Sequence, residues 1–194
     1  YNEFSYKNFT LSVLLDGQVG GKMYSHSHHK MTEQGKLAHT LNGRLPGTEF
    51  YMSKDDPRIA TAGLSPQDGM YMIAPGVVKN DDGSFSKNTK VVTVESYYKE
   101  YYRMANVETN TFSTDFLKLR EMRLEYKLPG STLKKTPFSK ASIAFYARNL
   151  FCITDYPLFD PESAALNVSS MVTGVETGSL PTARTFGLNI NLSF

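Results

Sequence analysis

The chain has 194 residues, a formal net charge of +2, a single cysteine and no tryptophan. This length predicts one domain, or two at most, and the small charge gives no electrostatic case for a nucleic-acid partner. One cysteine, Cys152, excludes an internal disulfide and a cysteine-based zinc site. The apolar runs are far shorter than the about 20 residues of a transmembrane helix, which leaves membrane-crossing strands open because these alternate in hydropathy.

Four segments alternate between apolar and polar residues with the period of a half-buried strand. In chain order they cover residues 6–16, 115–128, 141–151 and 184–194. Leu117 and Leu119 are out of phase with the apolar residues that follow them, which predicts a β-bulge near Arg120. The chain begins at Tyr1 without a signal peptide, so we expect a mature fragment or the later part of a longer polypeptide.

The segment 115–128 has one apolar and one charged face. The apolar face carries Met122, Leu124, Tyr126 and Leu128, and the other carries Glu121, Arg123, Glu125 and Lys127. A soluble protein would turn these charges toward bulk water, and a large barrel would turn them toward a wet or plugged lumen. The pattern alone leaves both alternatives open.

The C-terminal segment alternates most strictly. Its apolar positions are Phe186, Leu188, Ile190, Leu192 and Phe194. The length of 184–194 matches the about 9–11 residues with which a tilted strand crosses a bilayer. An edge strand of a soluble sandwich shows the same alternation, so this segment by itself does not decide between the two.

The connections between the predicted strands differ greatly in length. Residues 129–140 form a short polar turn, whereas 17–114 and 152–183 are long loops. Short turns at one rim and long loops at the other are typical of outer-membrane barrels, and both termini would then lie at the short-turn, periplasmic rim. Because four strands cannot close a barrel, the remaining strands must come from the same polypeptide or from partner chains.

Four motifs in chain order resemble the late barrel of the SusC/RagA family of TonB-linked transporters. They are the strand 6–17 followed by Gly20-Gly21, the run Phe116-Leu117-Lys118-Leu119-Arg120 ending on Tyr126-Lys127-Leu128-Pro129, Asn149-Leu150-Phe151 with Asp160-Pro161-Glu162, and Leu180-Pro181-Thr182-Ala183-Arg184-Thr185 with the terminal Phe194. Two positions depart from the family pattern: Pro157-Leu158 stands where a glycine is common, and Ala183 where a proline is frequent.

The resemblance implies an all-β fold, an antiparallel transmembrane β-barrel of about 22 strands, of which this chain would supply the last four. It implies import of bulky nutrients, glycans or oligopeptides, across the outer membrane of a Gram-negative, Bacteroidetes-type bacterium. It further implies a SusD-like surface lipoprotein as a lid and energy from TonB through an N-terminal plug, which these residues do not contain. No cofactor and no enzymatic activity are expected.

Two clusters in the first long loop are candidates for ligand or metal contact. Four tyrosines form two adjacent doublets that are joined by spacings of three to four positions: Tyr97, Tyr98, Tyr101 and Tyr102. On a helical turn they could contact a ligand or the lid, or instead pack within the loop or in an aromatic belt. Three histidines, His26, His28 and His29, could chelate a transition metal, but a polar loop is the favoured interpretation because the nearest carboxylate is Glu33.

The other polar motifs favour structural roles. Residues 80–84 resemble a calcium loop in composition only and are predicted to form a turn. Asp160 and Glu162 are interpreted as loop structure because no nucleophile motif accompanies them.

Two rival functions remain open. A soluble β-rich glycan-binding module would use the tyrosines for stacking and would fold alone. A passive porin would import without energy.

Overall fold

The computed structural model describes residues 1–158, 160–162, 165–167 and 170–194. They divide into two compact units, here named the sheet unit (Tyr1–Met23, Phe112–Gly174 and Ser179–Phe194) and the small unit (Tyr24–Thr111 and Val175–Gly178). Within the described residues, no helix combines the length and the hydropathy needed to cross a membrane.

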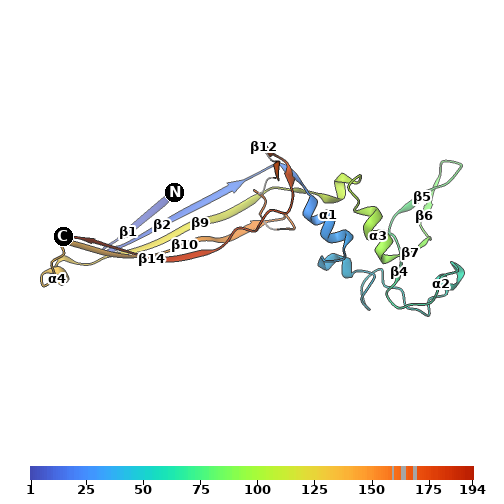
Figure 1. The fold of residues 1–194 in the computed structure, drawn as a ribbon, viewed down its shortest axis with the longest axis horizontal. Coiled ribbons are helices and arrows are strands. Elements are labelled where there is room, and N and C mark those ends of the chain that lie inside the picture. Colours follow the sequence, from blue (N-terminus) through green and yellow to red (C-terminus); the bar gives the residue numbers. More distant parts are fainter. Residues whose placement is uncertain (159, 163–164, 168–169) are drawn as a thin grey trace. The chain divides into compact units, whose positions relative to one another are not determined.

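The sheet unit is built on five antiparallel strands in the order β1-β2-β9-β10-β14, which lie side by side in Figure 1. The strands are β1 (Asn2–Tyr6), β2 (Phe9–Gln18), β9 (Phe116–Lys127), β10 (Lys140–Thr154) and β14 (Thr185–Ser193). The short helix α4 (Gly130–Leu133) lies in the turn between β9 and β10, and a small hairpin pairs β11 (Ala165–Asn167) with β12 (Ser170–Val172).

The predicted start of the first strand is wrong, because β2 begins at Phe9. Tyr6 ends β1 and pairs with Phe9, so the residues between them form a two-residue turn in which Lys7 has a left-handed φ of 54°. The segment predicted as one strand over 6–16 is therefore a turn and a strand, and the sheet has five strands where four were expected. The short run 2–6 lacks a clear strand pattern of its own, because its strand character depends on pairing with β2.

The predicted bulge at Arg120 is confirmed. Leu14 pairs with Glu121 and Leu15 pairs with Leu119, which leaves Arg120 without a partner position on β2. Because one extra residue reverses the side-chain phase of a strand, the bulge returns Leu117 and Leu119 to the face that carries Leu124. The apolar face therefore continues along the whole of β9.

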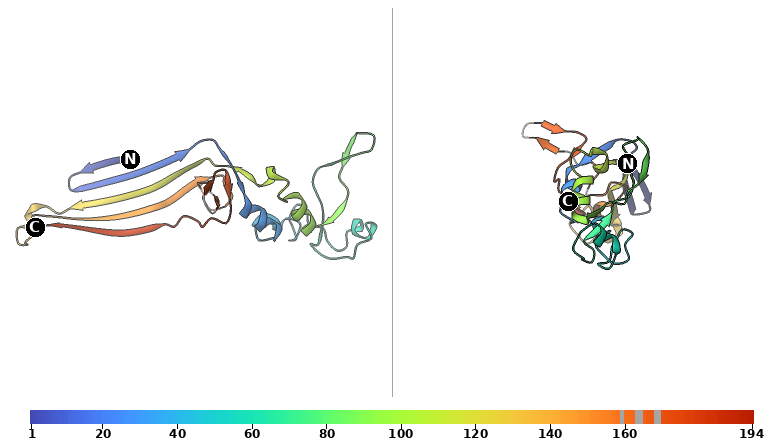
Figure 2. Two further views of the ribbon diagram at one scale, coloured as in Figure 1. Left: turned by 45° about the horizontal axis from the view of Figure 1, so that its top comes forward. Right: turned by 90° about the vertical axis from the view of Figure 1, so that its right-hand side faces the viewer.

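The range 17–114, predicted as one long loop, contains most of the small unit. Its elements are β3 (Lys22–Ser25), α1 (His26–Glu33), η1 (Ala38–Leu41), α2 (Pro57–Thr61), β4 (Tyr71–Ile73), β5 (Val77–Lys79), β6 (Phe85–Lys87), β7 (Val91–Thr93), α3 (Val94–Tyr101), η2 (Val107–Asn110) and β8 (Thr111–Ser113). β4 pairs with β7, and β13 (Val175–Glu176) runs parallel to β3. β5 pairs with β6 in the green hairpin of Figure 2.

Local chemistry explains where the small helices begin. Ser25 caps α1 by accepting the His28 N–H, and Thr93 caps α3 by accepting the Ser96 N–H. The elements then pack around two small apolar clusters, Met52–Ile59–Tyr71 and Met72–Val94–Tyr98. A structureless loop would not bury such clusters, so this segment is folded.

Candidate functional site

One face of the five-stranded sheet is apolar and exposed. A row of large side chains crosses it at Leu11, Leu124, Phe145 and Leu188, which are register partners on four successive strands. The next row holds Phe9, Tyr126, Ile143 and Ile190. On β14, Leu188 and Ile190 are 61% and 60% exposed, so their side chains face outward without a covering layer. Apolar patches of this extent mark surfaces that bind protein or lipid.

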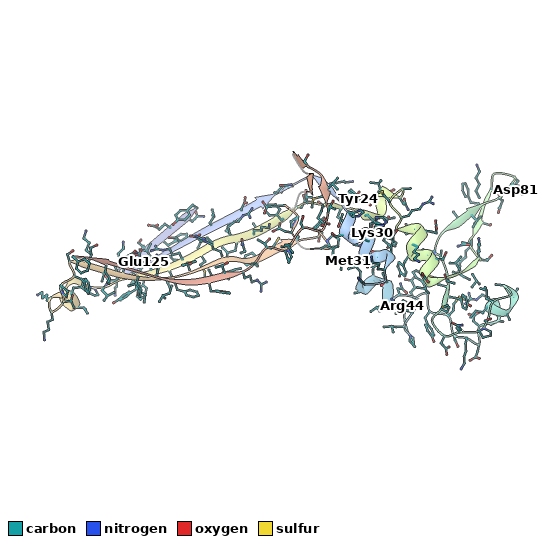
Figure 3. The ribbon with its side chains drawn as sticks, viewed as in Figure 1. Tyr24, Lys30, Met31, Arg44, Asp81 and Glu125 are labelled. Atoms are coloured by element: carbon teal, nitrogen blue, oxygen red, sulfur yellow. The ribbon has the colours of Figure 1, made fainter. Side chains whose placement is uncertain are left out.

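The opposite face of the sheet is polar, and its side chains are hydrogen-bonded around Glu125, which is labelled on the sheet in Figure 3. Glu125 accepts hydrogen bonds from Arg123 at 3.1 Å and from the Ser142 hydroxyl at 2.7 Å. Arg148 donates to Glu121 at 2.8 Å. The Tyr146 ring lies over Gly187, where a Cβ atom would collide with it. Charged residues predicted to share a face thus bond to one another along β9 and to polar residues of the adjacent β10.

An ion-pair cluster holds the Asp160-Pro161-Glu162 turn against the polar face of the sheet. Lys118, only 4% exposed, bonds Asp160 at 2.5 Å and also bonds Glu162. Arg120 bridges Glu162 at 2.5 Å and Asp16 at 2.7 Å. Burial opposes ionisation of Asp160, but the bonds from Lys118 and the Thr182 hydroxyl outweigh it and hold the pKa of Asp160 below its usual range. The cluster therefore fixes this turn to the polar face of the sheet.

The four predicted tyrosines, of which three lie on α3 and Tyr102 directly follows it, divide into two pairs. Tyr98 is buried at 6% exposure, and its hydroxyl donates to the carbonyl oxygens of His39 at 2.7 Å and Asn42 at 3.2 Å. Tyr102 lies beside it and contacts the His39 ring. Burial raises the pKa of Tyr98 to about 12, so its hydroxyl remains a donor at neutral pH. This pair packs inside the small unit.

The other pair lies at the surface. The rings of Tyr97 and Tyr101 are stacked at 5.4 Å with an interplanar angle of 10°, and Tyr101 is 48% exposed. They line a hollow of about 630 Å³ together with Pro75 and Lys90. Contact with a ligand or lid stays a prediction, which now concerns Tyr97 and Tyr101 rather than all four residues.

The three clustered histidines are bonded to different partners. His28 Nδ1 lies 2.9 Å from Asn110 Oδ1, while His29 lies between the Tyr24 hydroxyl at 3.2 Å and Glu33 at 2.8 Å. The ring of His26 lies edge-on to the ring of His29, with the two centroids 5.5 Å apart. Within the described part of the chain, no three histidine, cysteine or acidic side chains are grouped to hold a metal ion.

The predicted turn at residues 80–84 is confirmed. It joins β5 to β6, with the Asn80 N–H donating to the Ser84 carbonyl at 2.8 Å and Asp82 accepting from the Ser84 N–H and hydroxyl. The Asp82 side chain is thus used in the turn.

A stacked histidine pair makes the small unit sensitive to acid. The rings of His28 and His39 lie 5.1 Å apart at an angle of 20°. Burial lowers the pKa of both imidazoles, and for His28 it outweighs the hydrogen bond to Asn110 Oδ1, which acts in the opposite direction. The folded state therefore binds protons less readily than the unfolded state, whose histidines titrate near about 6.5.

We expect the unfolding free energy of the small unit to fall as the pH drops below about 6.5 and to be independent of this pair above it. Hydrogen exchange of α1 and α3 amides in the full-length protein, corrected for intrinsic rates, measures this. His39→Phe keeps a ring in the stack and should flatten the pH dependence, whereas His26→Gln, outside the stack, should not. An unchanged slope in His39→Phe would contradict the assignment.

Comparison with known proteins finds solved structures with a similar fold. No family model matches the chain. Over 87 residues it is 31% identical to the TonB-dependent receptor P3 of Formosa agariphila. This alignment covers 43% of this chain and 9% of the receptor. Two structures of the RagAB peptide importer, in the open-open and closed-closed states, match 98% of this chain and 16% of theirs, with TM-scores of 0.50 and 0.53 at 19% and 20% identity. The predicted resemblance is confirmed.

The comparisons differ in what they support. The structural likeness covers nearly the whole chain and shows a shared fold, whereas the sequence likeness covers less than half of it. The chain spans 9% of the length of the curated relative and 16% of the matched importer chains. The matched proteins are a receptor and a peptide importer, which fits the expectation of a chain without enzymatic activity.

Proposed function

We propose that this chain is the C-terminal barrel segment of a SusC/RagA-type, TonB-dependent importer. The importer lies in the outer membrane of a Gram-negative, Bacteroidetes-type bacterium and takes up bulky nutrients, glycans or oligopeptides. The five strands are part of a closed barrel of about 22 strands. A SusD-like lipoprotein covers the mouth, and TonB acts through a plug in the N-terminal part of the importer.

The observation that carries the proposal is the two-sided sheet. Its outward side chains, such as Leu188 and Ile190, are large, apolar and more than half exposed, while the opposite face is bonded through Glu125 and Glu121. At about 3.3 Å per residue, the nine residues of β14 extend roughly 30 Å, close to the thickness of a bilayer core. Lipid on one side and a wet lumen on the other satisfy both faces.

The edges of the sheet support the same conclusion. Among the residues that the structure describes, β1 and β14 each have a neighbouring strand on one side only, so both leave a row of backbone donors and acceptors unpaired in the sheet. An unpaired backbone group in hydrocarbon costs several kcal/mol. Further strands, from the rest of the polypeptide or from partner chains, would remove both edges.

The soluble glycan-binding module is the less favoured alternative. Such a module needs a second layer over the apolar face, and the side chains of Phe186, Leu188 and Ile190 are exposed. A passive porin differs from an importer because its uptake needs no energy. We expect uptake to stop when TonB is deleted, and uptake that persists would favour the porin.

The first test is the native mass of the polypeptide that ends in Asn191-Leu192-Ser193-Phe194. We expect an outer-membrane protein several times longer than these residues, because the chain spans only 16% of the matched importer chains. Fractionation followed by intact mass measurement decides. A soluble species of the mass of these residues alone would overturn the proposal in favour of the binding module.

A further inference from the structure

One end of the five-stranded sheet is rich in lysine. Two short turns meet there, the β1–β2 turn at Lys7-Asn8 and the β9–β10 turn that contains α4, and the Lys127 N–H donates to the Asn8 carbonyl at 2.9 Å. In Figure 1, α4 and the chain end marked C lie together at this end of the sheet. The lysines of the two turns and their flanks are here named the basic rim: Lys7, Lys127, Lys134, Lys135 and Lys140.

The basic rim has little counter-charge. Residues 4–15, 126–154 and 185–194 contain no aspartate or glutamate, and all five lysines of the rim are exposed. The acidic residues that follow along β9 and β1 already have partners, since Glu125 accepts from Arg123 at 3.1 Å and Glu3 accepts from the Ser12 hydroxyl at 3.3 Å. A terminal carboxylate at Phe194 would offset only one of the five charges. The rim therefore attracts anionic groups.

Aromatic rings place part of the rim on the apolar face of the sheet. Tyr6 is the register partner of Phe9 in the apolar row, and the Lys7 ammonium lies over the Tyr6 ring, 5.3 Å from its centroid. On the β9–β10 turn, the Phe138 ring lies 5.1 Å from the ring of Phe194, which continues the apolar alternation of β14. Aromatic residues at the end of a membrane-crossing strand lie at the depth of the lipid head groups.

The other two lysines belong to the polar face. Lys127 is the register partner of Ser142, and Lys140 is the partner of Ser193. Both line a polar-face hollow of about 370 Å³ beside α4. They are here named the inner lysines, and Lys7, Lys134 and Lys135 are named the outer lysines. Only the outer lysines lie in the same turns as Tyr6 and Phe138, so they are the ones placed to meet lipid.

The outer lysines suit an anionic head group. The short turns of an outer-membrane barrel face the periplasm, so this end of the sheet meets the inner leaflet. Lys134 and Lys135 directly follow α4 and precede Phe138 by three to four positions. Their long side chains can extend from an interfacial ring to a phosphate. Basic residues next to a membrane-crossing segment attract anionic lipids.

We propose that the outer lysines bind the phosphate of an anionic phospholipid of the inner leaflet, with phosphatidylglycerol as the model lipid. Tyr6 and Phe138 lie against its glycerol and upper acyl chain, which a free phosphate ion lacks. The inference rests on the proposed barrel and its orientation, and it adds a lipid partner at the periplasmic end.

The test uses the full-length importer, purified in detergent, delipidated and titrated with phosphatidylglycerol, with zwitterionic phosphatidylethanolamine as the comparison lipid. Native mass spectrometry counts the bound lipids and gives an apparent Kd. We expect phosphatidylglycerol to bind more tightly and its binding to weaken as ammonium acetate is raised. One lysine near an anionic lipid surface contributes about fivefold in affinity. Lys134→Ala/Lys135→Ala should therefore weaken phosphatidylglycerol binding about 25-fold and Lys7→Ala about fivefold, with little change for phosphatidylethanolamine.

The matched control is Lys127→Ala/Lys140→Ala, which removes the same charge from the inner side of the same rim. Lipid binding that is unchanged there but lost in Lys134→Ala/Lys135→Ala supports the proposal. Equal losses in the two double variants would show unspecific charge attraction, and a loss in the control alone would indicate an acidic partner in the lumen. Either result overturns the proposal, as would equal affinity for both lipids or displacement of phosphatidylglycerol by inorganic phosphate.

Barrel assembly of the wild type is scored separately by its heat-modifiable mobility on electrophoresis. An assembled barrel that does not prefer phosphatidylglycerol rejects the lipid site alone. A full-length protein that forms no barrel rejects the proposed function itself.

Discussion

Ile190→Arg should remove most of the assembled barrel from the outer membrane, whereas Asn191→Arg should leave assembly near the wild-type level. Ile190 is register partner of Ile143 on the apolar face, and Asn191 is partner of Ser142 on the polar face. A charge on the lipid face near mid-bilayer costs about 2–4 kcal/mol, while the same charge toward a wet lumen costs little. The heat-modifiable fraction of the full-length protein on electrophoresis measures the difference.

A second pair of substitutions repeats the test one row further along the same strand. Leu188 is the partner of Phe145 and Asn189 is the partner of Ala144, so Leu188→Arg should impair assembly and Asn189→Arg should not. Testing two pairs of positions shows whether the effect belongs to the whole face rather than to a single residue. Equal loss of barrel from both members of each pair would refute the assignment of the faces.

Lys118→Ala should release the Asp160–Glu162 turn from the sheet. Lys118 is buried and bonds both acidic residues, so its removal leaves the mostly buried carboxylate of Asp160 and the partly exposed carboxylate of Glu162 with fewer partners. Breaking a buried pair by removing one partner typically costs about 3–5 kcal/mol. We expect the lower end, because Arg120 still holds Glu162 and the Thr182 hydroxyl still bonds Asp160. Faster hydrogen exchange at the Glu162 amide measures the release.

The control for this substitution is Lys134→Ala, which removes an exposed lysine in the turn after β9 and should leave exchange unchanged. Lys118→Arg should restore part of the protection, since it keeps the charge but changes the geometry. If exchange at Glu162 in Lys118→Ala equals that of the wild type, the cluster does not hold the turn.

Several features of this protein were readable from the sequence alone because they depend on near neighbours. The two-residue period of residues 116–127 predicts which side chains share a face, since a strand turns successive residues to opposite sides. The phase change between Leu119 and Met122 predicts the bulge at Arg120, and Asp82-Gly83 predicts a turn. The four motifs and their order along the chain were sufficient to predict the resemblance to the SusC/RagA family.

Other features were decided only by the tertiary structure. No spacing rule brings Lys118 to Asp160, because the two are joined through the fold and not through a local element. The four tyrosines look alike in sequence, yet Tyr98 is buried under η1 and Tyr101 faces solvent, since packing of α3 chooses the buried side. The pairing of β1 with β2 and the compact small unit depend on burial between segments far apart along the chain.

Periodicity therefore determined the strands, their faces and their local irregularities. The tertiary structure determined which distant charges meet and which aromatic rings remain at the surface, because these contacts arise only when the elements pack together.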